Sequence, residues 1–518
     1  MKKILKNIIP FTIIFFMFGC SGKNNSFAED TETATMPVLT ITTTNQSANV
    51  MDFVTKPIDG YVAEQSASWT PGYQMPPEPY YEECSITLTD AEGTETLTDA
   101  IAQVKVRGNW TTNYEKKPLR IKFQEKQNLL GLNDGAKMKN WVLTAEYKDT
   151  SMLRNKTALQ IAREILGKDG LYVADAAFVE VNINGQYWGV YLLTEYQQIN
   201  EDRVNITKAE DDYTGTDIGY FLEFDGYYFT EDELQNFYVD YAGNAALLPF
   251  DGNNIPQIKV SCQSNGFNKS HKNVGFTIKN DIYSEEQRDF IASYINNVYR
   301  IMYYAAYKDK AYVFNSDYTE ISESTALSPK EAVEAVVNTA SLADMYIISE
   351  LTCDADIYWS SFFMDVDFGE NGDKKLTFEA PWDFDSALGN KDRCADGTGF
   401  WAANMVPDVN NEYYTINPWL AVLMHEDWFQ EIIRDKWTDA YDSGVFERAY
   451  ASIEKDTSLY REAFARNYEK WDNLKNNQAF VHELSAGSAA CRTHKESAEY
   501  LTDWLQKRVD FLNDYWHK

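Results

Sequence analysis

Five oxygen-bearing side chains gather in one short stretch of the chain and could act on a metal ion or a proton. Asp354, Asp356 and Ser361 come just before a pair of short extended runs, and Asp383 and Asp385 follow that pair. Because clustered carboxylates repel one another, a fold usually brings them together only where a cation or a shared proton offsets the repulsion. The pattern therefore favours a divalent metal site. The alternative in so acidic a chain is a solvated acidic loop.

A second group of side chains is basic and lies earlier in the sequence. Arg107, Lys117 and Lys122 fall in or beside expected strands, and Arg154 follows in the stretch 149–155. Guanidinium and ammonium groups suit a phosphate, and arginine can bind one through two parallel hydrogen bonds. This pattern predicts a phosphate site. The alternative is that these cations lie on exposed strand faces and pair with nearby acids.

Strands dominate the first part of the chain. Apolar and polar residues alternate there, as in half-buried strands. Asn184-Gly185 separates two of the runs, and this dipeptide tolerates the positive φ angles of a tight hairpin turn. One helix is expected at residues 151–166, with Ser151 placed to cap it. The predicted strands cover residues 37–42, 84–89, 102–108, 119–123, 178–183 and 187–193.

Helical periodicity dominates the second part, interrupted by one extended island at residues 362–366 and 376–380. The acidic residues flank this island, and Asp356 is expected at the end of a helical run. We therefore predict an α+β fold with a β-rich lobe at about 37–200 and a mainly helical lobe at about 201–518. The predicted helices cover residues 285–304, 328–351, 418–437, 446–471 and 493–516.

The first 36 residues are expected to direct export. Three lysines precede an apolar run at 8–18, which is roughly half of the ~20 residues needed to cross a bilayer. The sequence 17–20, MFGC, is typical of a bacterial lipobox, so we predict a lipoprotein signal peptide at 1–20 with lipid on Cys20. An ordinary cleaved signal is the alternative. Residues 21–36 are polar and predict a flexible tether, which would hold the domain at the bacterial cell surface.

Composition agrees with that location. A formal net charge of −32 argues against a nucleic-acid partner, since such binding requires a basic face. Five cysteines follow Cys20 without any CxxC pair, which favours buried free thiols with room for one disulfide. The length of 518 residues predicts a lobed body or two intimate subdomains. The sequence does not define the oligomeric state.

Five short segments occur in an order that makes a chance match improbable, and they span most of the chain from about Pro37. Through them the chain resembles the CotH family of atypical, spore-coat-type kinases. The resemblance implies a diverged protein-kinase-like fold and phosphoryl transfer from ATP. The segments are RGNW, KKPLRIKF, NWVLTAEYKDTSMLRN, VNINGQYWGVYLLTE and PWDFDSALG.

The resemblance also implies roles for the acidic residues. Asp356 and Ser361 have the spacing of the Asp and Asn in the kinase catalytic loop. Asp356 would accept or orient the proton of the acceptor hydroxyl, and Ser361 would take the position of a metal ligand. Asp383, or alternatively Asp385, would bind Mg²⁺ or Mn²⁺ in the place of the DFG aspartate.

The same resemblance implies a nucleotide site. Lys117 or Lys122 would supply the strand cation on the phosphates of ATP, and Arg107 or Arg154 would hold a phosphate. Glu195 would line the nucleotide pocket. The chain has no G-x-G-x-x-G loop and no His-Arg before its catalytic-loop aspartate, features that the CotH family also lacks.

The leading hypothesis is a secreted, lipid-anchored kinase that phosphorylates Ser or Thr hydroxyls of a surface or extracellular protein. The second is a non-catalytic cell-surface structural or carbohydrate-associated protein on the same scaffold, because ATP is scarce outside cells and aromatic residues can stack on glycans. Aromatic residues at helical spacing, such as Trp437 and Trp504, are however more often core. A glycosidase that uses Asp383 and Asp385 as acid and nucleophile ranks last.

Overall fold

The computed structural model describes residues 34–56, 80–108, 110–248, 250, 274–391, 396–404, 406–407, 414–474 and 484–518. The predicted signal peptide, Cys20 and most of the predicted tether lie outside the described residues. Met36 is fully buried, and the Ala34 N–H donates to the Leu459 carbonyl oxygen at 3.1 Å. Residues 34–36 therefore belong to the fold and not to the tether.

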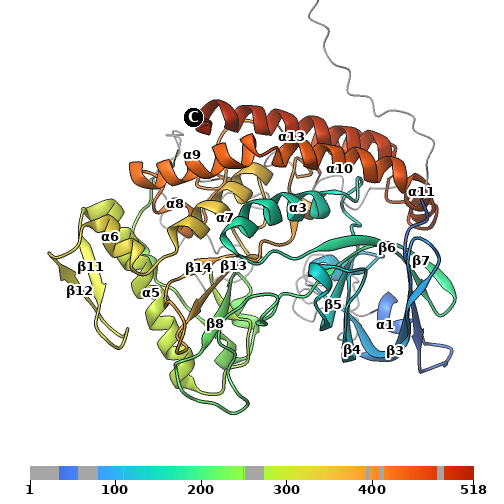
Figure 1. The fold of residues 1–518 in the computed structure, drawn as a ribbon, viewed down its shortest axis with the longest axis horizontal. Helices are drawn as coiled ribbons and strands as arrows, with labels where there is room; N and C mark the ends of the chain where they lie inside the picture. The colour runs from blue at the N-terminus through green and yellow to red at the C-terminus, as the bar shows by residue number, and fades with distance from the viewer. Residues whose placement is uncertain are drawn as a thin grey trace, which may run out of the picture.

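Seven strands form a closed barrel in the order β1-β2-β3-β4-β5-β7-β6, and β1 pairs with β6 in parallel to close it (Figure 1). Alternate side chains point inward, so β4 places Leu119, Ile121 and Phe123 in the barrel core and leaves Lys122 exposed. The strands are β1 (Val38–Thr43), β2 (Glu82–Thr89), β3 (Glu95–Val106), β4 (Leu119–Gln127), β5 (Met138–Thr144), β6 (Ala176–Ile183) and β7 (Gln186–Glu195).

The turn between β6 and β7 confirms the predicted hairpin. Asn184 and Gly185 have φ angles of 50° and 74°, the left-handed conformation that a two-residue turn of this kind requires at both positions. The Asn184 side chain also accepts a hydrogen bond from the Thr43 N–H at 2.9 Å, which joins the turn to β1.

A second sheet of five strands, in the order β14-β13-β8-β10-β9, lies in the part where mainly helices were expected (Figure 1). The predicted island supplies β13 and β14, and β13 pairs along its whole length with β8. The strands are β8 (Gly219–Asp225), β9 (Asn236–Phe237), β10 (Gly275–Ile278), β13 (Phe362–Asp367) and β14 (Thr377–Phe378). Two small hairpins are β11 (Ala311–Phe314) with β12 (Ile321–Ser324), and β15 (Val406–Pro407) with β16 (Tyr414–Thr415).

Helices α3, α7, α9, α10 and α13 pack in layers above this sheet, with α13, α9 and α10 outermost and α7 and α3 beneath them, while α5 and α6 lie to one side of the sheet and α1 lies at the barrel (Figure 1). The long predicted helices α5 and α13 are confirmed, and Thr493 caps α13 by accepting from the Glu496 N–H. The helices are α1 (Asp52–Thr55), α3 (Arg154–Leu166), α4 (Tyr241–Asn244), α5 (Glu285–Lys308), α6 (Pro329–Glu334), α7 (Thr339–Thr352), α8 (Pro418–Ala421), α9 (Asp427–Asp442), α10 (Val445–Leu459), α11 (Arg461–Lys470), α12 (Ala486–Ala490) and α13 (His494–Trp516).

Three predicted helices are each divided in two. The helix expected at 328–351 breaks between α6 and α7, where Val337 forms a parallel bridge to Leu376 and Asn338 caps α7. The helices expected at 418–437 and 446–471 separate into α8 with α9 and α10 with α11. Helix α3 begins at Arg154, because Asp149 rather than Ser151 accepts its first N–H, at 2.9 Å.

The core has two large parts, one inside the barrel and one between the second sheet and the helices. Trp437 and Trp504 are buried in the second of these, as expected for aromatic residues at helical spacing. Cys84 and Cys491 are free thiols and Cys353 is buried, while Cys262 and Cys394 lie outside the described residues. Among the helices that the structure describes, none combines the length and the apolar character that a bilayer crossing requires.

Candidate active site

Asp356 lies in the loop that leads from α7 to β13. Helix α7 ends at Thr352, and the left-handed backbone of Cys353 (φ 46°) turns the chain away from the helix axis. In the loop the Asp356 N–H donates to Asp354 Oδ1 at 3.0 Å. The sequence predicted Asp356 at the end of this helix. The structure instead places it in the loop beyond the helix.

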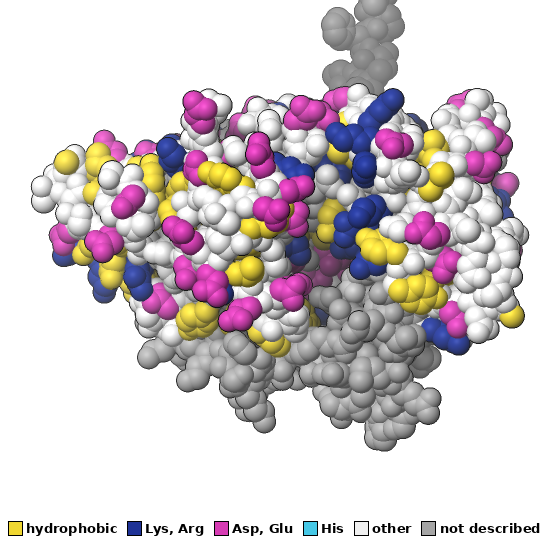
Figure 2. All heavy atoms as spheres, turned by 90° about the horizontal axis from the view of Figure 1, so that it is seen from below, with side chains coloured by type: hydrophobic (Ala, Val, Ile, Leu, Met, Phe, Trp, Pro, Cys, Tyr) yellow, Lys and Arg dark blue, Asp and Glu magenta, His cyan; other side chains and the backbone are white. Residues whose placement is uncertain are grey.

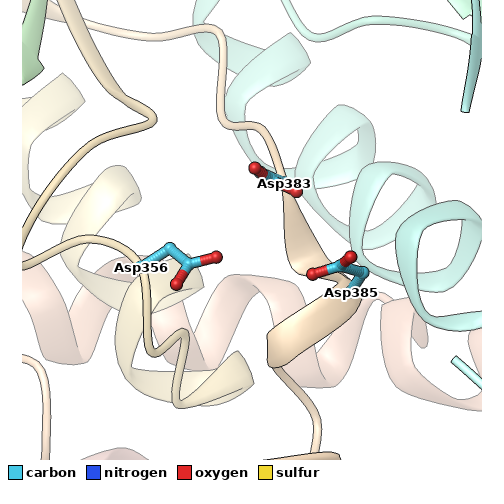
Figure 3. A group of neighbouring side chains, drawn as sticks. All are labelled: Asp356, Asp383 and Asp385. Carbon is cyan, nitrogen blue, oxygen red and sulfur yellow. The ribbon is translucent and has the colours of Figure 1, made fainter. Parts of the chain in front are cut away.

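Asp383 and Asp385 lie in the loop after β14. Asp383 has a left-handed backbone (φ 70°, ψ 60°), and residues 384–386 form one turn of 3-10 helix. The two carboxylates and that of Asp356 approach from opposite sides, and one oxygen of each lies within 4.8 Å of the others (Figure 3). In the described parts of the chain, this is the one group of three acidic, His or Cys side chains so arranged.

Two cations adjoin this aspartate cluster. Lys148 Nζ lies 3.1 Å from Asp385 Oδ1, and the side chains of the pair are only 7% and 12% exposed. Arg107 acts on Asp383 electrostatically and lies over the Trp382 ring, 5.5 Å from its centroid. Seen from below relative to Figure 1, the molecule has a recess near its middle that both acidic and basic side chains border (Figure 2).

The negative charges still outweigh these cations. Burial, and then the charges of Asp385 and Asp356, raise the pKa of Asp383 to about 8 despite Lys148 and Arg107. A carboxyl group whose ionisation is this unfavourable gains from a further cation. Three carboxylate oxygens at this separation also suit a hard divalent ion, which prefers oxygen ligands. The residues therefore fit Mg²⁺ or Mn²⁺.

Ser361 adjoins the same cluster. Its Oγ donates to Asp383 Oδ2 at 3.5 Å, a weak contact, and its N–H donates to Glu223 Oε1 at 3.0 Å. Glu223 comes from β8 and also pairs with Lys279 at 2.8 Å. The catalytic-loop spacing noted in the sequence thus brings both Asp356 and Ser361 close to Asp383.

A family model described as CotH kinase protein matches residues 104–512, which is most of the chain. The chain belongs to the CotH kinase family. The resemblance drawn from the five ordered segments is thereby confirmed, and so is the α+β, kinase-like fold with a β-rich N-terminal part and a helical C-terminal part. No curated protein matches the chain.

Of the basic residues predicted to bind phosphate, Arg107 is the one that this CotH kinase brings to the aspartates. Lys117 is engaged within its own segment, where Nζ donates to the carbonyl oxygens of Thr112 and Tyr114 at 2.8 and 2.6 Å. Burial lowers the pKa of Lys117 to about 8. Lys122 lies exposed on the outside of the barrel.

Arg154 and Glu195, the two other residues predicted to contact the nucleotide, each have a buried ion-pair partner. Arg154 and Asp149 form an ion pair whose side chains are both 0% exposed, and Arg154 Nε donates to the Leu388 carbonyl oxygen at 3.3 Å. Glu195 pairs with Arg203 at 3.0 Å, again with both side chains 0% exposed. Neither Arg154 nor Glu195 therefore offers exposed surface to a phosphate or a nucleotide.

Lys148 and Glu223 are site residues that the sequence did not reveal as such. Lys148 stands within the CotH segment NWVLTAEYKDTSMLRN, in the loop between β5 and α3. It is the one lysine of that segment and lies between two acidic residues, Glu146 and Asp149, which is the signal that could have identified it. Glu223 lies in a strand whose pairing with β13 is a long-range contact, so no local pattern marks it.

Proposed function

We propose that this CotH kinase transfers the γ-phosphoryl group of ATP to Ser or Thr hydroxyls of a surface or extracellular protein. The observation that carries the proposal is the aspartate cluster: three carboxylates from two loops, beside Lys148 and Arg107. Phosphoryl transfer depends mainly on positioning and charge neutralisation, and these groups are suited to both.

Each residue has a distinct role in the proposal. Asp356 accepts or orients the proton of the acceptor hydroxyl. Asp383 and Asp385, with Ser361 beside them, hold Mg²⁺ or Mn²⁺, which when bound neutralises charge on the phosphate oxygens. Arg107 supplies a guanidinium for a phosphate, and Lys148 balances the charge of Asp385.

The cellular setting is also proposed. The signal-like first 20 residues and Cys20 support export and lipid anchoring to the membrane, which would present the domain outside the cytoplasm. Growth of an expressing bacterium with a radiolabelled fatty acid tests this. Label is expected on the wild-type protein and not on Cys20→Ser, and equal labelling of both would contradict anchoring at this residue.

Transfer of labelled phosphate from ATP to a mixture of surface proteins tests the kinase activity. Activity is expected with Mg²⁺ or Mn²⁺ and is expected to disappear in Asp356→Ala and in Asp383→Ala. Glu370→Gln removes one exposed carboxylate from the turn after β13 and serves as the matched control. A wild-type protein that neither binds nucleotide nor transfers label refutes the proposal.

A further inference from the structure

Asp383 depends on its backbone conformation for the direction of its carboxylate. A φ of 70° brings Cβ close to the backbone, so residues other than glycine adopt it rarely, although aspartate tolerates it better than most. The next residue, Phe384, donates its N–H to Asn155 Oδ1 at 2.7 Å. This hydrogen bond fixes the peptide group on the C-terminal side of Asp383.

Asn155 is held in turn by Glu146. Asn155 Nδ2 lies 3.0 Å from both carboxylate oxygens of Glu146, and Thr144 Oγ1 donates to one of them at 2.6 Å. Since the Phe384 N–H can only donate, Asn155 must present its oxygen to Phe384 and its nitrogen to Glu146. Asn155 and Glu146 are 7% and 4% exposed, so water competes little for these bonds.

The hydrogen bonds join three elements of the fold. Thr144 ends β5, Asn155 lies in the first turn of α3, and Phe384 belongs to the loop after β14. Buried bonds between rigid elements are the usual means of orienting metal ligands. We propose that Asn155, fixed by Glu146, is a positioning residue that keeps the Asp383 carboxylate facing the rest of the aspartate cluster. The inference rests on the proposed metal-binding role of that cluster.

Binding of Mn²⁺ alone to the folded protein, followed through the electron paramagnetic resonance signal of free Mn²⁺, tests this role. Asn155→Ala removes the acceptor for Phe384 and is expected to weaken Mn²⁺ binding roughly 10- to 100-fold. Asn467→Ala is the matched control. Asn467 is also buried and accepts the Val190 N–H at 3.1 Å, but it joins α11 to the barrel. Its loss is expected to lower stability and leave Mn²⁺ affinity unchanged.

A pair of substitutions tests the same geometry by rescue. Asn155→Asp keeps the acceptor for Phe384 but sets a carboxylate against Glu146, and it is expected to weaken Mn²⁺ binding. Adding Glu146→Gln is expected to restore binding, because the new amide at position 146 can donate to the new carboxylate at position 155. This comparison decides the matter if Asn155→Ala does not fold.

Three results would overturn the positioning role: wild-type Mn²⁺ affinity in Asn155→Ala, equal weakening in Asn467→Ala, or no recovery in the double variant. A wild-type protein that binds no Mn²⁺ would overturn the metal role of the aspartate cluster and this inference with it. Mn²⁺ binding that depends on Asn155 in a protein without phosphoryl transfer would support the positioning role and remove only the kinase function.

Discussion

Replacement of Lys148 by methionine is expected to destabilise the metal-free protein. The substitution keeps most of the side-chain volume and removes the ammonium group that lies 3.1 Å from Asp385. It also removes one of the two cations that oppose the raised pKa of Asp383. The aspartate cluster would keep its three carboxyl groups. Of the two cations that act on Asp383, Arg107 would remain.

The structure sets the size of the effect. At 3.1 Å and an effective dielectric constant of about 20, the attraction between Lys148 and Asp385 is roughly 5 kcal/mol. Both side chains are mostly buried, so the loss of one partner leaves a charge that water solvates poorly. Removal of one member of such a pair costs about 3–5 kcal/mol. We expect a decrease in the free energy of unfolding within that range.

Urea denaturation with and without Mn²⁺ measures both parts of the prediction. Lys168→Met is the control, because its pair with Asp439 is exposed (41% and 67%) and such surface pairs contribute less than about 1 kcal/mol. A bound cation would replace the lost ammonium group, so the stabilisation by a fixed Mn²⁺ concentration should be larger in Lys148→Met than in wild type. A loss no greater than that of Lys168→Met would refute the reasoning.

Three further predictions concern stability. Arg508→Met leaves the Glu350 carboxylate without its ion pair, and the Glu350 side chain is 0% exposed. Urea denaturation is expected to show a free energy of unfolding that is lower by about 3–5 kcal/mol. A loss below about 1 kcal/mol would contradict this. Burial lowers the pKa of His494 to about 4. The unfolded chain therefore binds a proton at this residue before the folded protein does, and the free energy of unfolding should fall as the pH drops from about 6.5 to about 4. The decrease should be at most about 3 kcal/mol, because part of the residue is exposed. His494→Gln should flatten that pH profile. Gly189→Ala, at φ 127° and with the added Cβ 2.8 Å from two side-chain atoms, should cost more than about 1 kcal/mol, and unchanged stability would exclude the strain.

Local patterns predicted the elements whose side chains alternate or repeat regularly. The barrel strands around Ile121 and the Asn184-Gly185 turn were visible in the sequence, because burial on one face and positive φ each restrict residue type locally. The breaks in the predicted helices were not visible. Val337 leaves the helical path to pair with Leu376, a contact between segments that the sequence does not show to be neighbours.

The sequence predicted the acidic residues of the aspartate cluster but not all of the charged residues around them. Asp356 and Asp383 flank the same extended island, so the chain itself suggested that their carboxylates meet. The sequence grouped Arg154 with the candidate phosphate cations, but the structure buries its side chain and pairs it with Asp149. Lys148 reaches Asp385 across more than 200 residues of sequence, and only the packing of α3 beside the loop after β14 brings them together.

The sequence alone determined the α+β character, the family resemblance and the acidic residues available for chemistry, because each of these depends on residue type and local order. Only the tertiary structure decided which charged groups share one site. Electrostatic interactions act through space over a few ångströms, and burial changes their strength severalfold. Arg107 and Lys148 act on the aspartate cluster because the folded chain places them beside it. Arg154 is equally basic, but it forms a buried ion pair with Asp149.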